Sequence, residues 1–223
     1  SSVIKGNAYG HGIEVFVPLA EACGVRHFSV FDASEALRTL NSRTCKSDIM
    51  IMGAIDNDEL EWAIENDISF YIFNHYRLIK ALDISKSIGK PARVHLELET
   101  GLNRMGLDEK DLEEVVKIIT DNKENFKIEG VSTHFAGAES VNNYLRIQNQ
   151  IEKFNIMTNN LKRINTGIGL RHSACSAAVF NYPETIMDMV RVGIAQYGFW
   201  PTKETQLRYI LANSNDPMKK FND

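Results

Sequence analysis

The stretch ARVHLELE, residues 92–99, alternates apolar and polar side chains in the pattern of a β-strand. Successive side chains of a strand point to opposite faces. One face carries Val94, Leu96 and Leu98, and the other carries His95, Glu97 and Glu99. We expect the apolar face to meet packed helices and the polar face to line the interior of a closed sheet. Carboxylates in such an interior need cationic or hydrogen-bonding partners.

The alternation of strand-like and helix-like segments continues along the chain. We predict strands near residues 2–5, 26–30, 48–52, 68–72, 92–98, 128–133, 169–172 and 188–192. We predict helices near residues 12–24, 33–42, 57–66, 75–88, 109–121 and 142–162. Eight strand–helix units in little over 200 residues predict an α/β fold, a closed (β/α)8 TIM barrel. An open doubly wound sheet is the alternative, because the last two units are irregular.

No linker rich in proline or glycine divides the chain. We therefore predict one barrel domain over residues 1–201, followed by a polar tail over residues 202–223. The chain opens with SSVIK, without an initiator methionine, and closes on NSNDPMKKFND. We expect it to be a fragment of a longer protein.

Composition argues for a small-molecule partner. The 223 residues are 43% hydrophobic and carry a formal charge of -4, and basic residues are scattered among acidic ones. This pattern argues against a nucleic-acid or anionic-membrane surface. Three widely spaced cysteines fit a reducing compartment, and no apolar run approaches the roughly 20 residues of a membrane span. We expect a cytoplasmic protein.

Polar residues cluster at the ends of at least five predicted strands, where the chemistry of a parallel barrel collects. They are Lys5 and Tyr9, Arg104, His134, His172 and Ser176, and Arg191 with Gly193 and Ile194 behind it. Each alone is commonly structural, since lone histidines are often core residues and arginines often pair at the surface. Their convergence is what points to a site.

Three kinds of chemistry could use this set. A desolvated lysine can form a Schiff base with a carbonyl substrate or with pyridoxal phosphate. Alternatively, four side chains could hold a metal: His95, Glu97, His134 and His172. The site could also bind a phosphorylated ligand without catalysis. The amides of Gly193 and Ile194 and the hydroxyl of Ser176 suit a phosphate. A phosphate site together with a strand-end lysine favours a phosphorylated aldehyde cofactor, and we expect no metal.

Five motifs resemble, in order and spacing, the signature segments of the alanine racemase family. These motifs are VIKGNAYGHG, LETGLNRMG, STHFAGAE, HSACSAA and MVRVGIAQYG. The resemblance runs from about residue 3 to residue 201. It implies a barrel domain that binds pyridoxal 5′-phosphate (PLP) and belongs to an isomerase that interconverts L- and D-alanine, supplying D-alanine for peptidoglycan.

The resemblance also implies roles for individual residues. Lys5 would hold the cofactor as a Schiff base and exchange a proton at the substrate Cα. Tyr9 would bind the cofactor phosphate, together with Ser176, Gly193 and Ile194.

The remaining implied roles belong to three residues. His134 would pack beside the cofactor ring, and Arg104 would approach its phenolic oxygen. Arg191 would donate to the ring nitrogen, and because a guanidinium does not give up its proton, that nitrogen would stay unprotonated. The weaker electron sink would disfavour side reactions and leave proton transfer at Cα as the main path.

Some positions depart from the family pattern. Glu97 stands where many members have a lysine, often modified to a carbamate, and we expect its carboxylate to reach Arg104 directly. Cys175 replaces an asparagine, and Gly6 replaces an alanine. These two departures leave the substrate preference undecided. The family's second base, a tyrosine that acts across a homodimer interface, lies in a C-terminal β domain that we expect to be absent from this chain, so we expect the fragment alone to be inactive.

Other roles remain open for such a barrel. They are a serine or broad-specificity racemase, an amino-acid decarboxylase and a non-catalytic protein of PLP homeostasis. A metal-dependent hydrolase is the alternative outside this cofactor class.

Overall fold

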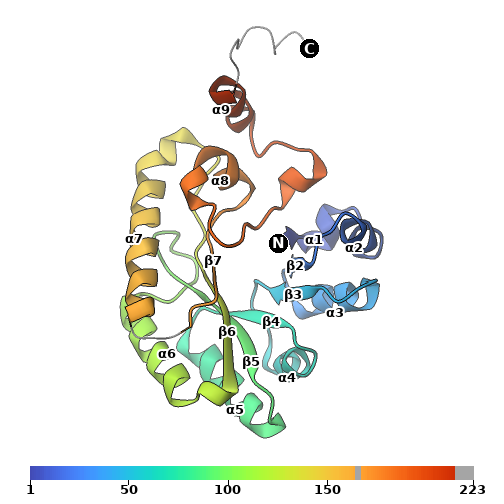
Figure 1. The fold of residues 1–223 in the computed structure, drawn as a ribbon, viewed down its shortest axis with the longest axis vertical. Helices are drawn as coiled ribbons and strands as arrows, with labels where there is room; N and C mark the ends of the chain where they lie inside the picture. Colours follow the sequence, from blue (N-terminus) through green and yellow to red (C-terminus); the bar gives the residue numbers. More distant parts are fainter. Residues whose placement is uncertain (164–166, 214–223) are drawn as a thin grey trace.

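The computed structural model describes residues 1–163 and 167–213 and contains one parallel sheet (Figure 1). Its seven strands are β1 (Ser2–Val3), β2 (His27–Val30), β3 (Asp48–Ile51), β4 (Ser69–Ile72), β5 (Ala92–Glu97), β6 (Phe126–Ser132) and β7 (Leu170–His172). They pair in the order of the sequence. A doubly wound sheet reverses its strand order at a switch point, so that alternative is excluded.

The predicted strand near 188–192 does not form as a regular strand. Instead, Val192 makes a parallel bridge to Ser2, and Arg191 makes one to Cys175. The amide of Val3 donates to the carbonyl of Val192 at 2.9 Å. This short segment therefore connects β1 to the chain that follows β7, and it takes the eighth position of the ring. The predicted barrel topology is confirmed, with one irregular position.

The described residues form nine helices, which include the six that the sequence predicts. They are α1 (Lys5–Tyr9), α2 (Ile13–Ala22), α3 (Ala33–Ser42), α4 (Asn57–Glu65), α5 (His75–Ile88), α6 (Glu109–Asp121), α7 (Tyr144–Arg163), α8 (Ser176–Asn181) and α9 (Lys203–Asn213). Four short 3-10 turns are η1 (Lys123–Asn125), η2 (Val141–Asn143), η3 (Pro183–Thr185) and η4 (Ile194–Tyr197). The six predicted helices correspond to α2–α7. Figure 1 shows α9 at one end of the molecule, next to α8. Part of the predicted tail is therefore helical, and residues 214–223 lie outside the described residues.

Helix starts follow ordinary capping rules. The side chains of Asp32, Asn74 and Asp108 accept hydrogen bonds from the amides three residues later, at the starts of α3, α5 and α6. Such caps satisfy amides that the first helical turn leaves without a partner. They fix where each crossover helix begins after its strand, and hence the length of each loop at the carboxyl ends of the strands.

The two faces of β5 separate as its alternation predicts. Val94, Leu96 and Leu98 are at most 1% exposed and belong to the apolar core between sheet and helices. On the other face, His95 and Glu97 are buried in the barrel interior. Glu99 departs from the prediction. It lies past the strand and accepts hydrogen bonds from loop amides of Gly101 and Asn103.

In the part of the chain that the structure describes, no helix is both long enough and apolar enough to cross a membrane.

Candidate active site

A cavity of about 440 Å³ opens at the carboxyl ends of the strands. Of the nine strand-end residues predicted from the sequence, His172 alone does not line it. The other eight do, namely Lys5, Tyr9, Arg104, His134, Ser176, Arg191, Gly193 and Ile194. These residues come from loops after five different strands or strand-like segments. The barrel topology thus gathers into one cavity residues that lie as much as 189 positions apart in the chain.

Lys5 begins a short turn of left-handed backbone, which the sequence alone did not predict. Gly6, Asn7, Ala8 and Tyr9 all have φ between 54° and 63°. For a residue with a side chain this conformation costs about 1–2 kcal/mol. The turn therefore needs support from its surroundings, and it decides in which directions Lys5 and Tyr9 leave the backbone.

Arg191 is 5% exposed and is tied to several strands at once. Its Nη1 donates to the hydroxyl of Tyr71 at 2.8 Å, and its Nη2 donates to the carbonyl of Thr133 at 2.7 Å. Further bonds reach the carbonyls of His172 and Ser173. Both terminal nitrogens are thus used by the protein. Among the described residues Nε has no hydrogen-bond acceptor, although the side chain lines the cavity.

Two histidines continue this chain of hydrogen bonds. Nη1 of Arg191 lies 3.0 Å from Nδ1 of His172, and Nε2 of His172 lies 2.9 Å from Nδ1 of His95. A guanidinium only donates, so Nδ1 of His172 must accept and its proton must sit on Nε2. Burial, above all, holds the pKa of both histidines well below the ordinary value, so both rings are neutral.

Glu97 faces the cavity as a buried carboxylate whose Oε2 has no hydrogen-bond partner among the described residues. Burial raises the pKa of its carboxyl from 4.5 to about 7, although the charges of Arg191 and Arg104 act in the opposite direction. The predicted direct contact with Arg104 is wrong. Within the described chain no hydrogen bond or ion pair joins them, because Glu97 is fixed on β5 while Arg104 lies exposed in the loop beyond it.

Hydrogen-bonding groups suited to an anion gather around Ser176. Its hydroxyl accepts from the amides of Gly193 at 2.9 Å and Ala195 at 3.4 Å. A Cβ on Gly193 would lie 2.4 Å from the hydroxyl oxygen of Tyr9, so a side chain there would displace this hydroxyl. The hydroxyls of Tyr9 and Ser176 and these amides therefore meet at one place in the cavity. Clusters of this kind bind phosphate oxygens.

His134 also lines the cavity and is neutral at ordinary pH. Burial, followed by the charges of Arg191, Arg104 and Lys5, lowers its pKa to about 3. A neutral imidazole can pack against a flat aromatic ligand without adding a further charge. Its position next to three cations makes protonation unfavourable.

The sequence reasoning missed Tyr71, which holds Arg191 from β4. Its burial raises the pKa of its hydroxyl, so it stays neutral. The motif SFYI reads as a continuous apolar strand, which hid its role. The sequence did offer one signal. Tyr71 places a hydroxyl next to the last residue of β4, and the ends of the strands carry the chemistry of such a barrel. Several apolar side chains of the cavity were also missed, among them Phe31, Met52 and Met105.

The alternative metal site gains no support from the geometry. Across residues 1–163 and 167–213, no group of three or more His, Cys, Asp or Glu side chains could hold a metal ion. His95 and His172 do come together, but His172 already accepts from Arg191 and is placed to donate to His95.

The fold and the cavity together define a (β/α) barrel with a lysine-bearing cavity, the candidate active site, at the carboxyl ends of its strands. A family model described as "Alanine racemase, N-terminal domain" matches residues 1–201. The chain belongs to this family, which confirms the resemblance found in its motifs.

Individual relatives agree with this assignment. The alanine racemase of Desulforamulus reducens is 34% identical over 213 residues, covering 94% of this chain and 56% of the relative. The structure of the Clostridium difficile 630 alanine racemase in complex with cycloserine has a TM-score of 0.82 and 30% identity, covering 91% and 55% of the two chains. For the Bacillus anthracis alanine racemase with bound L-Ala-P, the TM-score is 0.81 and the identity 28%, covering 91% and 52%. This chain thus spans little more than half the length of these relatives.

Proposed function

We propose that this chain is the barrel part of a PLP-dependent amino-acid racemase, an isomerase that interconverts L- and D-alanine and supplies D-alanine for peptidoglycan. The observation that carries the proposal is that all eight residues implied by the family resemblance line one cavity. Relatives named alanine racemase support the choice of reaction, and relatives with bound cycloserine and L-Ala-P support a small-molecule substrate.

The residues present fit PLP. Arg191 has its terminal nitrogens bound by the protein, which leaves Nε–H as the donor for a ring nitrogen. The hydroxyls of Tyr9 and Ser176, with the amides of Gly193 and Ile194, would hold the phosphate. His134, being neutral, would pack beside the ring, and Lys5 would hold the aldehyde carbon covalently. When bound, PLP stabilises negative charge at the substrate Cα, which is what racemisation requires.

The chain's own groups divide the remaining work. Lys5, once free of the cofactor, would move a proton at Cα on one face of the substrate. Arg104, exposed at the rim, would approach the cofactor's phenolic oxygen. Arg191 does not give up its proton and so would leave the ring nitrogen unprotonated, which would disfavour side reactions.

Racemisation also needs a proton donor on the opposite face. We propose that a tyrosine from the partner subunit supplies it, in a cytoplasmic homodimer that includes a C-terminal β domain. The family resemblance supports this part of the proposal.

The experiment follows the substrate Cα in the protein at its natural length. With PLP and L-alanine in deuterium oxide, we expect D-alanine to form and deuterium to appear at Cα, and we expect Lys5→Ala to abolish both. The same assay with L-serine measures the breadth of the substrate specificity. A protein that binds PLP yet neither interconverts nor labels alanine would instead be a PLP carrier, and release of carbon dioxide would identify a decarboxylase.

A further inference from the structure

The start of α3 differs from that of α4, although both have the same cap spacing. In α4, the carboxylate of Glu59 accepts from the amide of the N-cap residue Asp56 at 3.3 Å, the return bond of a capping box. In α3, the side chain of Asp32 accepts a hydrogen bond from the amide of Glu35 at 2.8 Å. The carboxylate of Glu35, however, makes no such return bond and turns toward other segments.

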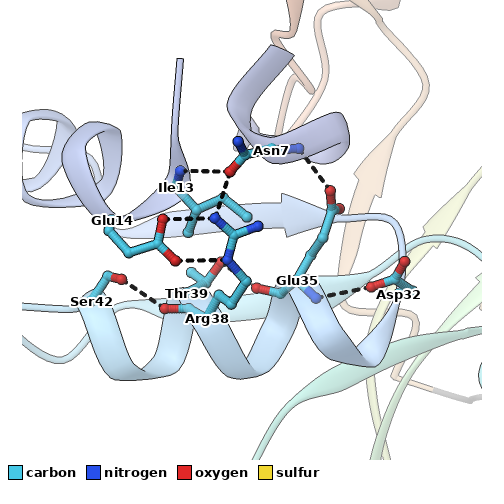
Figure 2. A network of polar contacts seen from close by, with 8 residues as sticks. All are labelled: Asn7, Ile13, Glu14, Asp32, Glu35, Arg38, Thr39 and Ser42. Atoms are coloured by element: carbon cyan, nitrogen blue, oxygen red, sulfur yellow. Dashed lines mark hydrogen bonds and ion pairs between the residues drawn. The ribbon is translucent and has the colours of Figure 1, made fainter. Parts of the chain in front are cut away.

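Glu35 joins the end of β2 to the left-handed turn α1. Its Oε2 accepts from the amide of Phe31 at 2.9 Å. Its Oε1 accepts from the amide of Asn7, also at 2.9 Å (Figure 2). Asn7 lies midway between Lys5 and Tyr9 in the sequence. One carboxylate thus fixes the centre of the turn that carries both cavity residues.

A second side chain of α3, that of Arg38, binds the side chain of Asn7. Nη2 of Arg38 donates to Oδ1 of Asn7 at 2.6 Å, and Arg38 also binds both carboxylate oxygens of Glu14. The amide of Ile13 donates to the same Oδ1 at 3.2 Å. Figure 2 shows these contacts meeting at Asn7 above α3. The backbone of Asn7 is thus held by Glu35 and its side chain by Arg38.

We propose that Glu35 is a positioning residue for Lys5 and Tyr9. Asn7, Ala8 and Tyr9 are held in a conformation that residues with side chains disfavour, so contacts outside the turn decide how fully it is populated. Without the carboxylate, the turn relaxes and the two side chains lose their alignment in the cavity. This inference rests on the proposed function of Lys5 as the residue that holds PLP.

The test compares Glu35→Ala and Glu35→Gln with Glu59→Ala, which removes a carboxylate at the matching position of α4. Each variant is made in the protein at its natural length. PLP affinity is measured from the visible absorbance of the lysine-bound cofactor, and exchange of the Asn7 amide is followed by hydrogen–deuterium exchange. The two readouts report on the cavity and on the turn itself.

We expect Glu35→Ala to weaken PLP binding about tenfold or more and to speed exchange of the Asn7 amide. Glu35→Gln should fall between it and the wild type, because a carboxamide oxygen can accept from one amide while its nitrogen cannot accept from the other. Glu59→Ala should change neither readout. If Glu35→Ala does not fold, Glu35→Gln carries the comparison.

Equal PLP affinity and equal Asn7 exchange in the Glu35 and Glu59 variants would overturn the positioning role while leaving the proposed function intact. A wild-type protein that forms no lysine-bound cofactor, or forms it equally well after Lys5→Ala, would instead overturn the proposed function, and this inference with it.

Discussion

At the scale of single residues, Glu97 makes stability depend on pH. The pKa of its carboxyl is raised from 4.5 to about 7, first by burial. A carboxyl with a higher pKa in the folded protein than in the unfolded chain disfavours folding once it ionises. The contribution of Glu97 to the free energy of unfolding of the cofactor-free protein should therefore fall between about pH 4.5 and pH 7. At 1.36 kcal/mol per pKa unit the loss is about 3 kcal/mol.

The variant Glu97→Gln should remove this dependence. Urea unfolding at about pH 4.5 and about pH 8 should show that the variant gains about 3 kcal/mol relative to the wild type at the higher pH. The exposed Glu113→Gln serves as the control and should show no such gain. An equal difference between Glu97→Gln and the wild type at both pH values would show that Glu97 ionises as easily as in water.

Much of the site could be predicted at this scale because one rule applied. Chemistry collects at the carboxyl ends of parallel strands, and each strand end is visible in the sequence. The sequence could not predict which side chains from different strands and loops contact one another. Tyr71 looked like a core residue, and Glu97 looked like the partner of Arg104. Both depend on distances between loops that are set only when the barrel closes.

At the scale of elements, β6 and β7 need a glycine at position 130. A Cβ there would lie 2.5 Å from the carbonyl oxygen of Leu170 and 2.7 Å from Nδ1 of His95. Gly130→Ala must therefore push the strands or the histidine pair apart. We expect it to lower the free energy of unfolding by about 1–3 kcal/mol, measured by urea denaturation.

Gly167→Ala is the matched control, since an added Cβ there meets nothing within 4 Å. It should change stability by no more than about 0.5 kcal/mol. Equal effects of the two substitutions would mean that β6 and β7 are not packed as closely as the structure shows.

Element boundaries were predictable where amphipathic periodicity was strong, as in α3 and α6. The left-handed turn was not. NAYGHG contains glycines that permit positive φ, but Asn7, Ala8 and Tyr9 take it as well. Hydrogen bonds from α3 support the turn, and a local sequence pattern does not contain them.

At the scale of the whole molecule, Arg191 ties the last segment of the ring to strands β4 and β7 and to the residue that follows β6. Its guanidinium binds Tyr71, Thr133 and His172. Arg191→Ala leaves these buried groups without their donor, so we expect it to lower the free energy of unfolding by about 3 kcal/mol. Urea denaturation of the cofactor-free protein measures this loss.

The control is Arg171→Ala, which removes a half-exposed ion pair with Asp188. That pair should contribute less than about 1 kcal/mol. If Arg191→Ala is no more destabilising than Arg171→Ala, then Arg191 does not hold the ring together.

The barrel itself could be predicted because repeated strand–helix units leave few topologies. The irregular structure at the eighth position of the ring could not be predicted. The sequence near 188–192 has the residues of a strand, but the ring is joined there only by bridges at Arg191 and Val192. The described helix α9 was likewise missed, because its sequence is polar and shows little amphipathic periodicity.

The central claim is that Lys5 holds PLP in this cavity. The most direct measurement is borohydride reduction of the PLP-loaded protein, followed by digestion and mass spectrometry of the labelled peptide. The account predicts a pyridoxyl group on the Lys5 side chain, and no label at that peptide in Lys5→Ala. A label on another lysine, or unchanged labelling after Lys5→Ala, would contradict it.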